Sequence, residues 1–283
     1  MSTYAAIDLA GLAAPQVVET LDPEEILAAI KADVIERAPE LEAVLALESE
    51  PSVKLLEAAA WREYILRARI NDAARAVMMA FAVGTDLDHL AALLGVGRLT
   101  GETDAEFRAR TQLSLEGFTT AGPVGAYQFH AQSAHAEVKD VAVASPVPGT
   151  VAITVLSDVG DGVPSQEVLD AVEAAVNADN VRPLSDFVQV AAATISAFAV
   201  VAEITFASGE NVPARLAEIE AAVQAYVDGR HNLGATVSLS GLYAALHQPG
   251  VVSAAMSAPV ADVETTATVA PYCTAITISE AVA

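Results

Sequence analysis

The chain has 283 residues and a formal net charge of −23, from 37 Asp and Glu residues against 14 Lys and Arg residues. Nucleic acid is excluded as a partner, because its phosphates would be repelled. The hydrophobic fraction is 53% and the mean hydropathy is +0.42, which predicts apolar surface left over for partner proteins. The most apolar stretches are shorter than the ~20 residues that span a bilayer, so no membrane insertion is expected.

The N-terminal sequence and the cysteine content predict the same compartment. The first ten residues, "MSTYAAIDLA", lack the basic start and the apolar run of a signal peptide. Cys273 is the single cysteine, which excludes an internal disulfide and fits a reducing environment. We therefore expect a soluble protein that is made in the cytoplasm.

Residues 1–52 form an acidic N-terminal arm with one short helix. The arm carries 11 acidic and 2 basic residues. Within it, "DPEEILAAIKADVIERA" begins with Asp22 as a helix cap and Pro23 at the first helical position, followed by acids in the first turn.

A long helix is predicted over 53–83, beginning near Pro51 and closed by Gly84. Its sequence from Leu55 to Phe81, "LLEAAAWREYILRARINDAARAVMMAF", is unusually basic for this chain. Favourably spaced partners explain part of that charge, at about 0.2–0.5 kcal/mol per pair. The expected pairs are Lys54–Glu57, Glu63–Arg67, Arg69–Asp72 and Asp72–Arg75. Shorter helices follow in "TDLDHLAALLGV", "TDAEFRARTQLSLEG" and "PVGAYQFHAQSA".

The long helix has two apolar stripes. With Arg62 at 0° and a step of about 100° per residue, the first stripe falls between about 20° and 120° and is interpreted as a core stripe. It consists of Leu55, Leu56, Ala59, Leu66, Ile70, Ala73, Val77 and Phe81. The second stripe falls between about −40° and −120°, on the opposite side. It consists of Trp61, Ile65, Ala68, Ala76 and Met79. Arginines occupy the seams between the stripes.

A helix that is apolar on two faces has two interpretations. It is either sandwiched inside its own domain with solvated flanks, or its second face docks another chain while the arginines meet acidic partners. The short helices of this region offer little material to cover both faces, which favours the second interpretation. The predicted partner interface consists of Trp61, Arg62, Ile65, Ala68, Arg69, Arg75 and Met79.

The second half of the chain changes to Val/Ile/Thr-rich runs bounded by Pro, Gly and Ser, which predict strands. These are "VKDVAVAS", "TVAITVLS", "FVQVAAATIS" and "FAVVAEITF", with two helices between and after them. A repeat is present, because "GAYQFHAQSAHAEVKDVAVASP" is similar to "GLYAALHQPGVVSAAMSAP", and Glu173 and Glu220 occupy matching helices.

The predicted fold class is α+β: a helical N-terminal region followed by two tandem, related α/β units, whose small sheets are covered by helices. The expected segments are the arm 1–52, a helical region 53–136, a first α/β unit 137–207 and a second, repeat-related α/β unit 208–283.

No catalytic constellation is found. Nucleotide-binding, serine-hydrolase, zinc-protease and Cys-x-x-Cys motifs are all absent from the sequence. His130 and His135 are about 140° apart on a helix and would not share a metal. The loop "SDVGDG" is a strand-to-helix turn capped by Ser165 rather than a calcium loop. We expect no enzyme activity, no catalytic residues, no cofactor-binding residues, no cofactor and no metal.

Several long stretches resemble one known family. They are "LDPEEILAAI", "ESEPSVKLLEAAAWREYILRARINDAARAVMMAFAVGTDLDHLAALLGVGR", "FRARTQLSLEGFTTAGPVGAYQFHAQSA" and "DNVRPLSDFVQV". In these stretches the chain is similar to the baseplate assembly protein J family of contractile-tailed bacteriophages and phage-tail-like bacteriocins (tailocins). The resemblance covers nearly the whole chain.

The resemblance implies a structural baseplate wedge subunit in a virion or tail particle, made and assembled in the bacterial cytoplasm. Such a subunit pairs within a wedge and joins neighbouring wedges into a ring around the central hub. Its helical part bundles with another wedge protein, and its C-terminal part contacts other copies. The expected partners are therefore a homo-oligomer and other wedge and hub proteins. A hub or receptor-binding component of the same particle is the alternative, and a tail hydrolase is a third option.

Overall fold

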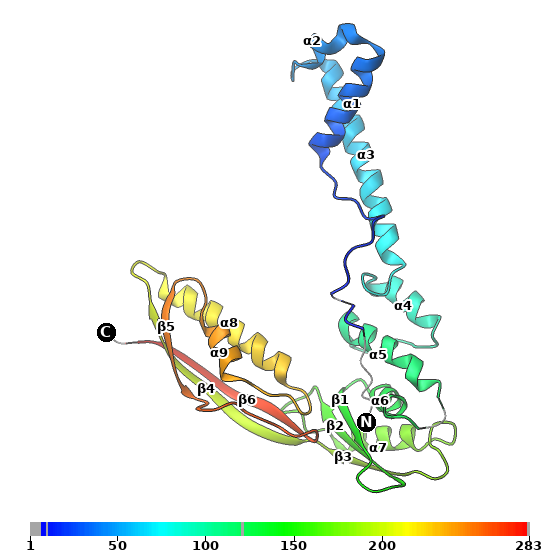
Figure 1. The fold of residues 1–283 in the computed structure, drawn as a ribbon, viewed down its shortest axis with the longest axis vertical. Coiled ribbons are helices and arrows are strands. Elements are labelled where there is room, and N and C mark those ends of the chain that lie inside the picture. Colours follow the sequence, from blue (N-terminus) through cyan, green and yellow to red (C-terminus); the bar gives the residue numbers. More distant parts are fainter. Residues whose placement is uncertain (1–6, 10, 120–121, 282–283) are drawn as a thin grey trace. The chain divides into compact units, whose positions relative to one another are not determined.

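The computed structural model describes residues 7–9, 11–119 and 122–281, which form two compact units. The helical unit lies within residues 7–98 and 103–108, and the α/β unit lies within residues 99–102 and 109–281. The predicted α+β fold class is confirmed: N-terminal helices are followed by two small mixed sheets that carry helices (Figure 1).

Capping and proline placement set the starts of the helices in the helical unit. The side chain of Asp22 accepts a hydrogen bond from the backbone N–H of Glu24 at 2.8 Å, and Pro23 occupies the first turn of α1. Pro51 opens α3 in the same way, as predicted. Gly84, predicted to close the long helix, instead opens α4. The elements are α1 Pro23–Arg37, the 3-10 helix η1 Pro39–Leu41, α2 Glu42–Leu45, α3 Pro51–Ala76 and α4 Gly84–Ala92.

Helix α3 ends at Ala76, before the predicted end at residue 83. The residues that follow form turns, and a distant side chain binds their carbonyl groups. Arg108 donates from Nε to the carbonyl oxygen of Met79 at 2.7 Å and from Nη2 to that of Ala82 at 2.6 Å. These charge-assisted bonds satisfy backbone groups outside the helix and so stabilise its early end.

The first half of the α/β unit is a three-stranded sheet in the order β1-β2-β3. Strands β1 and β2 are antiparallel, whereas β2 and β3 are parallel and are joined through α7. Buried Tyr127 of α6 and Val172 of α7 pack with Val155 of β2 in one core. The Ser165 hydroxyl caps α7, as predicted, by accepting from the N–H of Val168 at 3.4 Å. The elements are α5 Asp104–Gly117, α6 Val124–Gln132, β1 Val138–Ala144, β2 Thr150–Ser157, α7 Gln166–Val176 and β3 Phe187–Ala192, and residues 104–108 of α5 belong to the helical unit.

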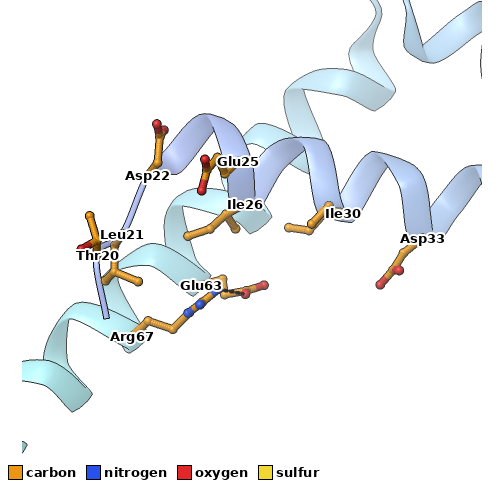
Figure 2. Close-up of a pocket in the computed structure, with 10 residues that line it drawn as sticks. Thr20, Leu21, Asp22, Glu25, Ile26, Ile30, Asp33, Glu63 and Arg67 are labelled. Carbon is orange, nitrogen blue, oxygen red and sulfur yellow. Dashed lines mark hydrogen bonds and ion pairs between the residues drawn. The ribbon is translucent and has the colours of Figure 1, made fainter. Parts of the chain in front are cut away.

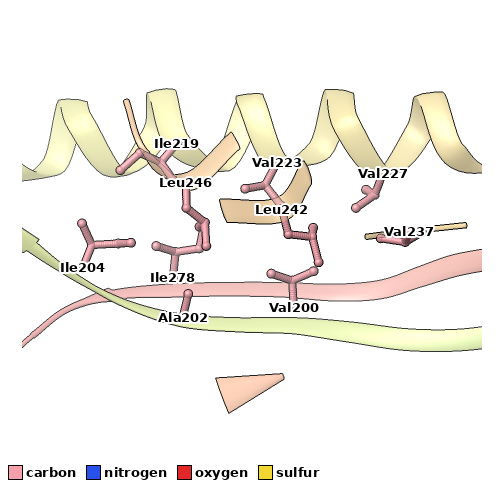
Figure 3. Packing of buried hydrophobic residues seen from close by; sticks show 10 residues of the cluster. All are labelled: Val200, Ala202, Ile204, Ile219, Val223, Val227, Val237, Leu242, Leu246 and Ile278. Atoms are coloured by element: carbon pink, nitrogen blue, oxygen red, sulfur yellow. The ribbon is translucent and has the colours of Figure 1, made fainter. Parts of the chain in front are cut away.

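The second half is another three-stranded sheet, in the order β5-β4-β6. Strand β4 is antiparallel to β5 and parallel to β6. Figure 3 shows the core, in which Ile219 and Val223 of α8 and Leu242 of α9 lie over Val200 of β4 and Ile278 of β6. The elements are β4 Thr194–Phe206, α8 Val212–Arg230, α9 Leu239–Leu246, β5 Val251–Ala258 and β6 Val269–Glu280.

The two halves share an arrangement but not a chain order. Each has a central strand with one antiparallel and one parallel neighbour, and the helix–strand pair α6–β1 corresponds to α9–β5. The strand after β1 is central, whereas the strand after β5 lies at the sheet edge, because β4 has taken the central place. The second half is therefore a reordered version of the first rather than a simple copy.

The Gly-x-Tyr stretch at the start of α6 and α9 has a packing reason. A Cβ atom on Gly241 would collide with the ring of Tyr226, and one on Gly125 would collide with the side chain of Glu116. Each helix therefore approaches its neighbour more closely than a larger residue would permit.

Candidate partner interface

Helix α3 packs against its own unit through a narrow face. Val53, Ala60 and Asn71 are its buried residues, and α1 lies alongside it (Figure 1). Ala60 and Asn71 lie about 160° and 180° from Arg62 by the helical period. The covered face is therefore opposite Arg62, and its small alanine allows α1 to come close.

Asn71 fastens the arm to α3. Its Oδ1 accepts from the N–H of Glu19 at 3.0 Å, and its Nδ2 donates to the carbonyl oxygen of Glu19 at 2.9 Å. Its amide therefore pairs with the backbone in the way a neighbouring strand would. Arg67 forms an ion pair with the carboxylate of the same glutamate and donates a hydrogen bond to it from Nε at 2.8 Å. This hydrogen bond raises the pKa of Arg67 above its usual value.

We expect Asn71→Leu to lower the stability of the helical unit by about 1–3 kcal/mol, because both backbone groups of Glu19 lose their partner in a partly buried place. Urea unfolding followed by the fluorescence of the single tryptophan, Trp61, measures this loss. Asp72→Leu, at an exposed neighbouring position, is the control and should change little. Equal stability of the two variants would contradict the role given to Asn71.

A pocket opens where the arm enters α1. Figure 2 shows Leu21, Glu25 and Ile26 facing Glu63 and Arg67 across it. The guanidinium of Arg67 is already held by Glu19 at 2.6 Å and by Glu63 at 3.3 Å. The pocket therefore offers no uncommitted cation to an anionic ligand, and its charged groups serve to hold the arm.

The stripe predicted to be the core side of the long helix is largely exposed, with only Leu56 and Phe81 partly buried, so that interpretation was wrong. Leu55, Leu66, Ile70 and Val77 have 73%, 65%, 58% and 69% of their surface exposed. The helical period shows where the apolar stripes lie, but not which of them is packed against other residues. The described part of the helical unit packs only against the face around Ala60, which belongs to neither stripe. These four large apolar side chains, which were predicted to lie in the core, are therefore available to a partner.

The predicted interface residues on α3 lie at the surface. Trp61 is 54% exposed and stacks on Tyr64 with ring centroids 5.3 Å apart, and Ile65 is 46% exposed. Arg62, Arg69 and Arg75 are exposed, and Ala68 and Met79 are partly buried. Met79 follows the end of the helix, so its predicted place on the second stripe does not hold.

The charge pattern along α3 differs partly from the expected pairing. Lys54 pairs with Glu57 at 2.8 Å and Arg67 with Glu63 at 3.3 Å, as predicted. Within the described residues, no ion pair forms at Arg62, Arg69 or Arg75, although the last two were expected to pair with Asp72. Arg62 and Arg69 lie between the two apolar stripes, so their charges are free for another chain.

The described residues offer little to catalysis. Across 7–9, 11–119 and 122–281, no three His, Cys, Asp or Glu side chains come together to hold a metal ion. In the same residues no helix is both long and apolar enough to cross a bilayer.

Burial raises the pKa of the Cys273 thiol, which disfavours the reactive thiolate, and burial lowers the pKa of His130.

Comparison with known proteins places the chain in one family. Residues 48–104 match the Baseplate J-like N-terminal domain, 119–192 the Baseplate J-like central domain and 198–279 the Baseplate J-like protein C-terminal domain. The second and third matches correspond to the two sheets of the α/β unit. Baseplate protein J of Escherichia phage P2 is 44% identical over 289 residues, which cover 95% of each chain.

Among solved structures, a cryo-EM structure of the anti-feeding prophage (AFP) baseplate is similar to this chain. The identity is 16% and the TM-score 0.44, over 62% of this chain, which spans 43% of the length of that chain. The family assignment rests on the domain matches and on the phage P2 relative. The chain belongs to the baseplate J-like family and is a structural, non-enzymatic protein of a contractile-tail baseplate.

Proposed function

We propose that the chain is a wedge subunit, which assembles with copies of itself and with other wedge proteins into a ring around the central hub and rearranges when the tail contracts. The observation that carries this proposal is the surface of α3, where two apolar stripes and unpaired arginines are exposed together. Such a surface is costly on a protein that stays alone in water.

The apolar stripes supply the driving force for assembly. Complete burial of a Leu, Ile or Phe-sized side chain contributes about 1.5–3 kcal/mol. Leu66, Ile70 and Trp61 are each more than half exposed, so most of that contribution is still available to a partner. The stripes lie on two sides of the helix, which suits a bundle in which α3 contacts more than one helix.

The arginines supply selectivity. Arg62 and Arg69 lie between the stripes and lack ion-pair partners in the described residues. Any helix that buries both stripes must place acceptors near these guanidinium groups, because leaving a charge buried without a partner is costly. The partner is therefore expected to carry Asp or Glu beside its own apolar stripe, and helices that carry Lys or Arg there are rejected.

Rearrangement requires interfaces that can change. Contraction switches a baseplate between two arrangements, and a two-state element responds only if its contacts differ by a few kcal/mol between the states. A half-exposed stripe with charged edges suits such an interface better than a fully apolar core does.

The double variant Trp61→Ser/Ile65→Ser tests the proposal. The isolated chain should remain folded, because both side chains are about half exposed, but co-assembly should fall at least about ten-fold as the apolar contact is lost. The measurement is size-exclusion chromatography with light scattering after co-expression with the other tail proteins of the same particle. Circular dichroism of the isolated chain checks the fold.

Leu93→Ser is the matched control, because Leu93 is 82% exposed in the same unit but lies outside α3. Assembly of this variant should be unchanged. If the α3 variant assembles normally, or if the isolated chain unfolds because the helix is needed inside its own domain, the proposed interface is wrong.

A further inference from the structure

Two grooves of the α/β unit have the same construction. In the first half a groove runs between the outer side of α7 and strand β3, and in the second half a groove runs between α8 and strand β6. The helix residues of the first are Asp170, Glu173, Ala174 and Asn177, and those of the second are Ala217, Glu220, Ala221 and Gln224. Every member of the second set follows its counterpart by 47 positions, so the two helix walls are equivalent parts of the repeat, whereas the bordering strands β3 and β6 are not related by that spacing.

Both strands that border the grooves have an open edge. Strand β3 pairs only with β2, and β6 pairs only with β4, among the strands that the structure describes. The N–H groups of Phe187 and Ala193 point toward β2, where they donate to the carbonyl oxygens of Gly149 and Val155. Successive residues of a strand direct their backbone groups to opposite sides. The N–H and C=O groups of Val188 and Val190 therefore point away from β2, toward the open edge.

The second edge follows the same rule. The N–H of Ala281 donates to the carbonyl oxygen of Ile204 in β4, and the register is unbroken from Ala275 onward. The even-numbered residues Ile276 and Ile278 therefore direct their backbone groups away from β4, toward the open edge. In both halves the residues with free edge groups are also those whose side chains pack under the helices, namely Val188 and Val190 in the first and Ile276 and Ile278 in the second.

The helix walls of both grooves are acidic, while Arg182, which also lines the first groove, donates from Nη1 to the carbonyl oxygen of Asp186 at 2.9 Å. Glu173 and Glu220 are exposed, and neither forms an ion pair among the described residues. Asp170 adds a second carboxylate to the first groove, where it accepts a hydrogen bond from Gln166 at 2.7 Å. On the other face of the first sheet Phe187 is 62% exposed beside the strand edge.

We infer that each groove binds an extended segment of a partner chain, which adds as a strand to β3 or β6 and directs lysine or arginine side chains toward Glu173 or Glu220. The open edge supplies backbone hydrogen bonds. Because the side chains of an added strand point alternately to the two faces of the sheet, the site selects a segment with basic residues on the helix side and apolar residues on the other. A second copy of this chain is the weaker occupant, because its own acidic grooves and its charge of −23 oppose edge-to-edge pairing.

The inference goes beyond the proposed function, since these grooves and α3 belong to different compact units. The probe is a synthetic hexapeptide in which lysine and valine alternate, capped at both ends and titrated into the full chain. Its control is a block peptide of the same composition, with three lysines followed by three valines. Both carry the same charge, but only the alternating peptide can face lysines to one side of an added strand.

The decisive readout is amide hydrogen exchange measured residue by residue. Saturating alternating peptide should slow exchange of the outward amides of Val188, Val190, Ile276 and Ile278 at least about ten-fold, because each gains a backbone acceptor. The block peptide should leave them unchanged. Absence of binding, or equal effects of the two peptides, would overturn the proposal.

Charge variants give an independent check. The double variant Glu173→Lys/Glu220→Lys should weaken binding of the alternating peptide about ten-fold, since each groove exchanges an attraction for a repulsion. Glu167→Lys is the control, because Glu167 is exposed on α7 but does not line the groove. An equal loss in both variants would show general attraction to an acidic protein and would also overturn the proposal. The Trp61→Ser/Ile65→Ser variant should bind the peptide normally, so failure of the α3 interface and failure of the grooves are distinguishable.

Discussion

Replacing Glu102 by alanine is expected to destabilise the α/β unit by about 3–5 kcal/mol, because it breaks a buried ion pair and leaves a guanidinium group without its main acceptor. Arg110 donates from Nε and Nη2 to the two carboxylate oxygens of Glu102, each at 2.7 Å, and the two side chains are only 6% and 8% exposed. The same carboxylate accepts from the N–H of Leu99 at 2.9 Å, so the loop before α5 is released as well. Urea unfolding monitored by far-UV circular dichroism, with hydrogen exchange of core amides to identify the unit, measures the loss.

Two further variants separate the causes. Glu218→Ala removes an exposed partner of Arg215 and should cost at most about 1 kcal/mol, since exposed pairs contribute little. The double variant Glu102→Met/Arg110→Met should recover most of the lost stability, because no uncompensated charge remains. If Glu102→Ala costs no more than Glu218→Ala, the pair is solvated and its structural role is refuted.

Local signals in the sequence predict where elements begin. Asp22 and Pro23 fix the start of α1, and Ser165 caps α7, because each acts on backbone groups within three residues. The end of α3 was not predictable in the same way. It depends on Arg108, whose partner Met79 is 29 residues away in sequence.

The order of strands has the same limit. Val/Ile/Thr-rich runs predict that strands exist, but pairing decides which strand is central. In the second half β4 pairs with both β5 and β6, so the strand that follows β5 in the chain is placed at an edge. Only the tertiary pairing makes the groove between β6 and α8 available.

The surface of α3 shows what periodicity can and cannot give. It correctly separates two apolar stripes, and it places Trp61 and Ile65 where the structure has them, at the surface. It cannot tell which face is covered, because the cover comes from α1 and from the arm, which Asn71 binds through Glu19, 52 residues earlier. A buried polar residue is the opposite of the signal that hydrophobic periodicity follows.

Leu242→Ala and Leu66→Ala are expected to have opposite consequences. Leu242 of α9 is fully buried in the core of the second half, so its truncation leaves a cavity and should cost about 2–5 kcal/mol in the isolated chain. Leu66 of α3 is 65% exposed, and its truncation should change the stability of the isolated chain by no more than about 0.5 kcal/mol. Urea unfolding measures both values.

The assembled state should show a different contrast. If α3 is buried against other chains, Leu66→Ala weakens co-assembly measured by light scattering, while its isolated chain unfolds at the same urea concentration as the unchanged protein. Leu242→Ala lowers the unfolding midpoint whether or not partners are present, because its contacts are all within the chain. A loss at Leu66 as large in the isolated chain as at Leu242 would mean that α3 is covered by its own unit. An apolar side chain that contributes nothing to folding and much to association is the physical signature of an interface, and Leu66, Ile70 and Trp61 are the residues on which that signature should appear.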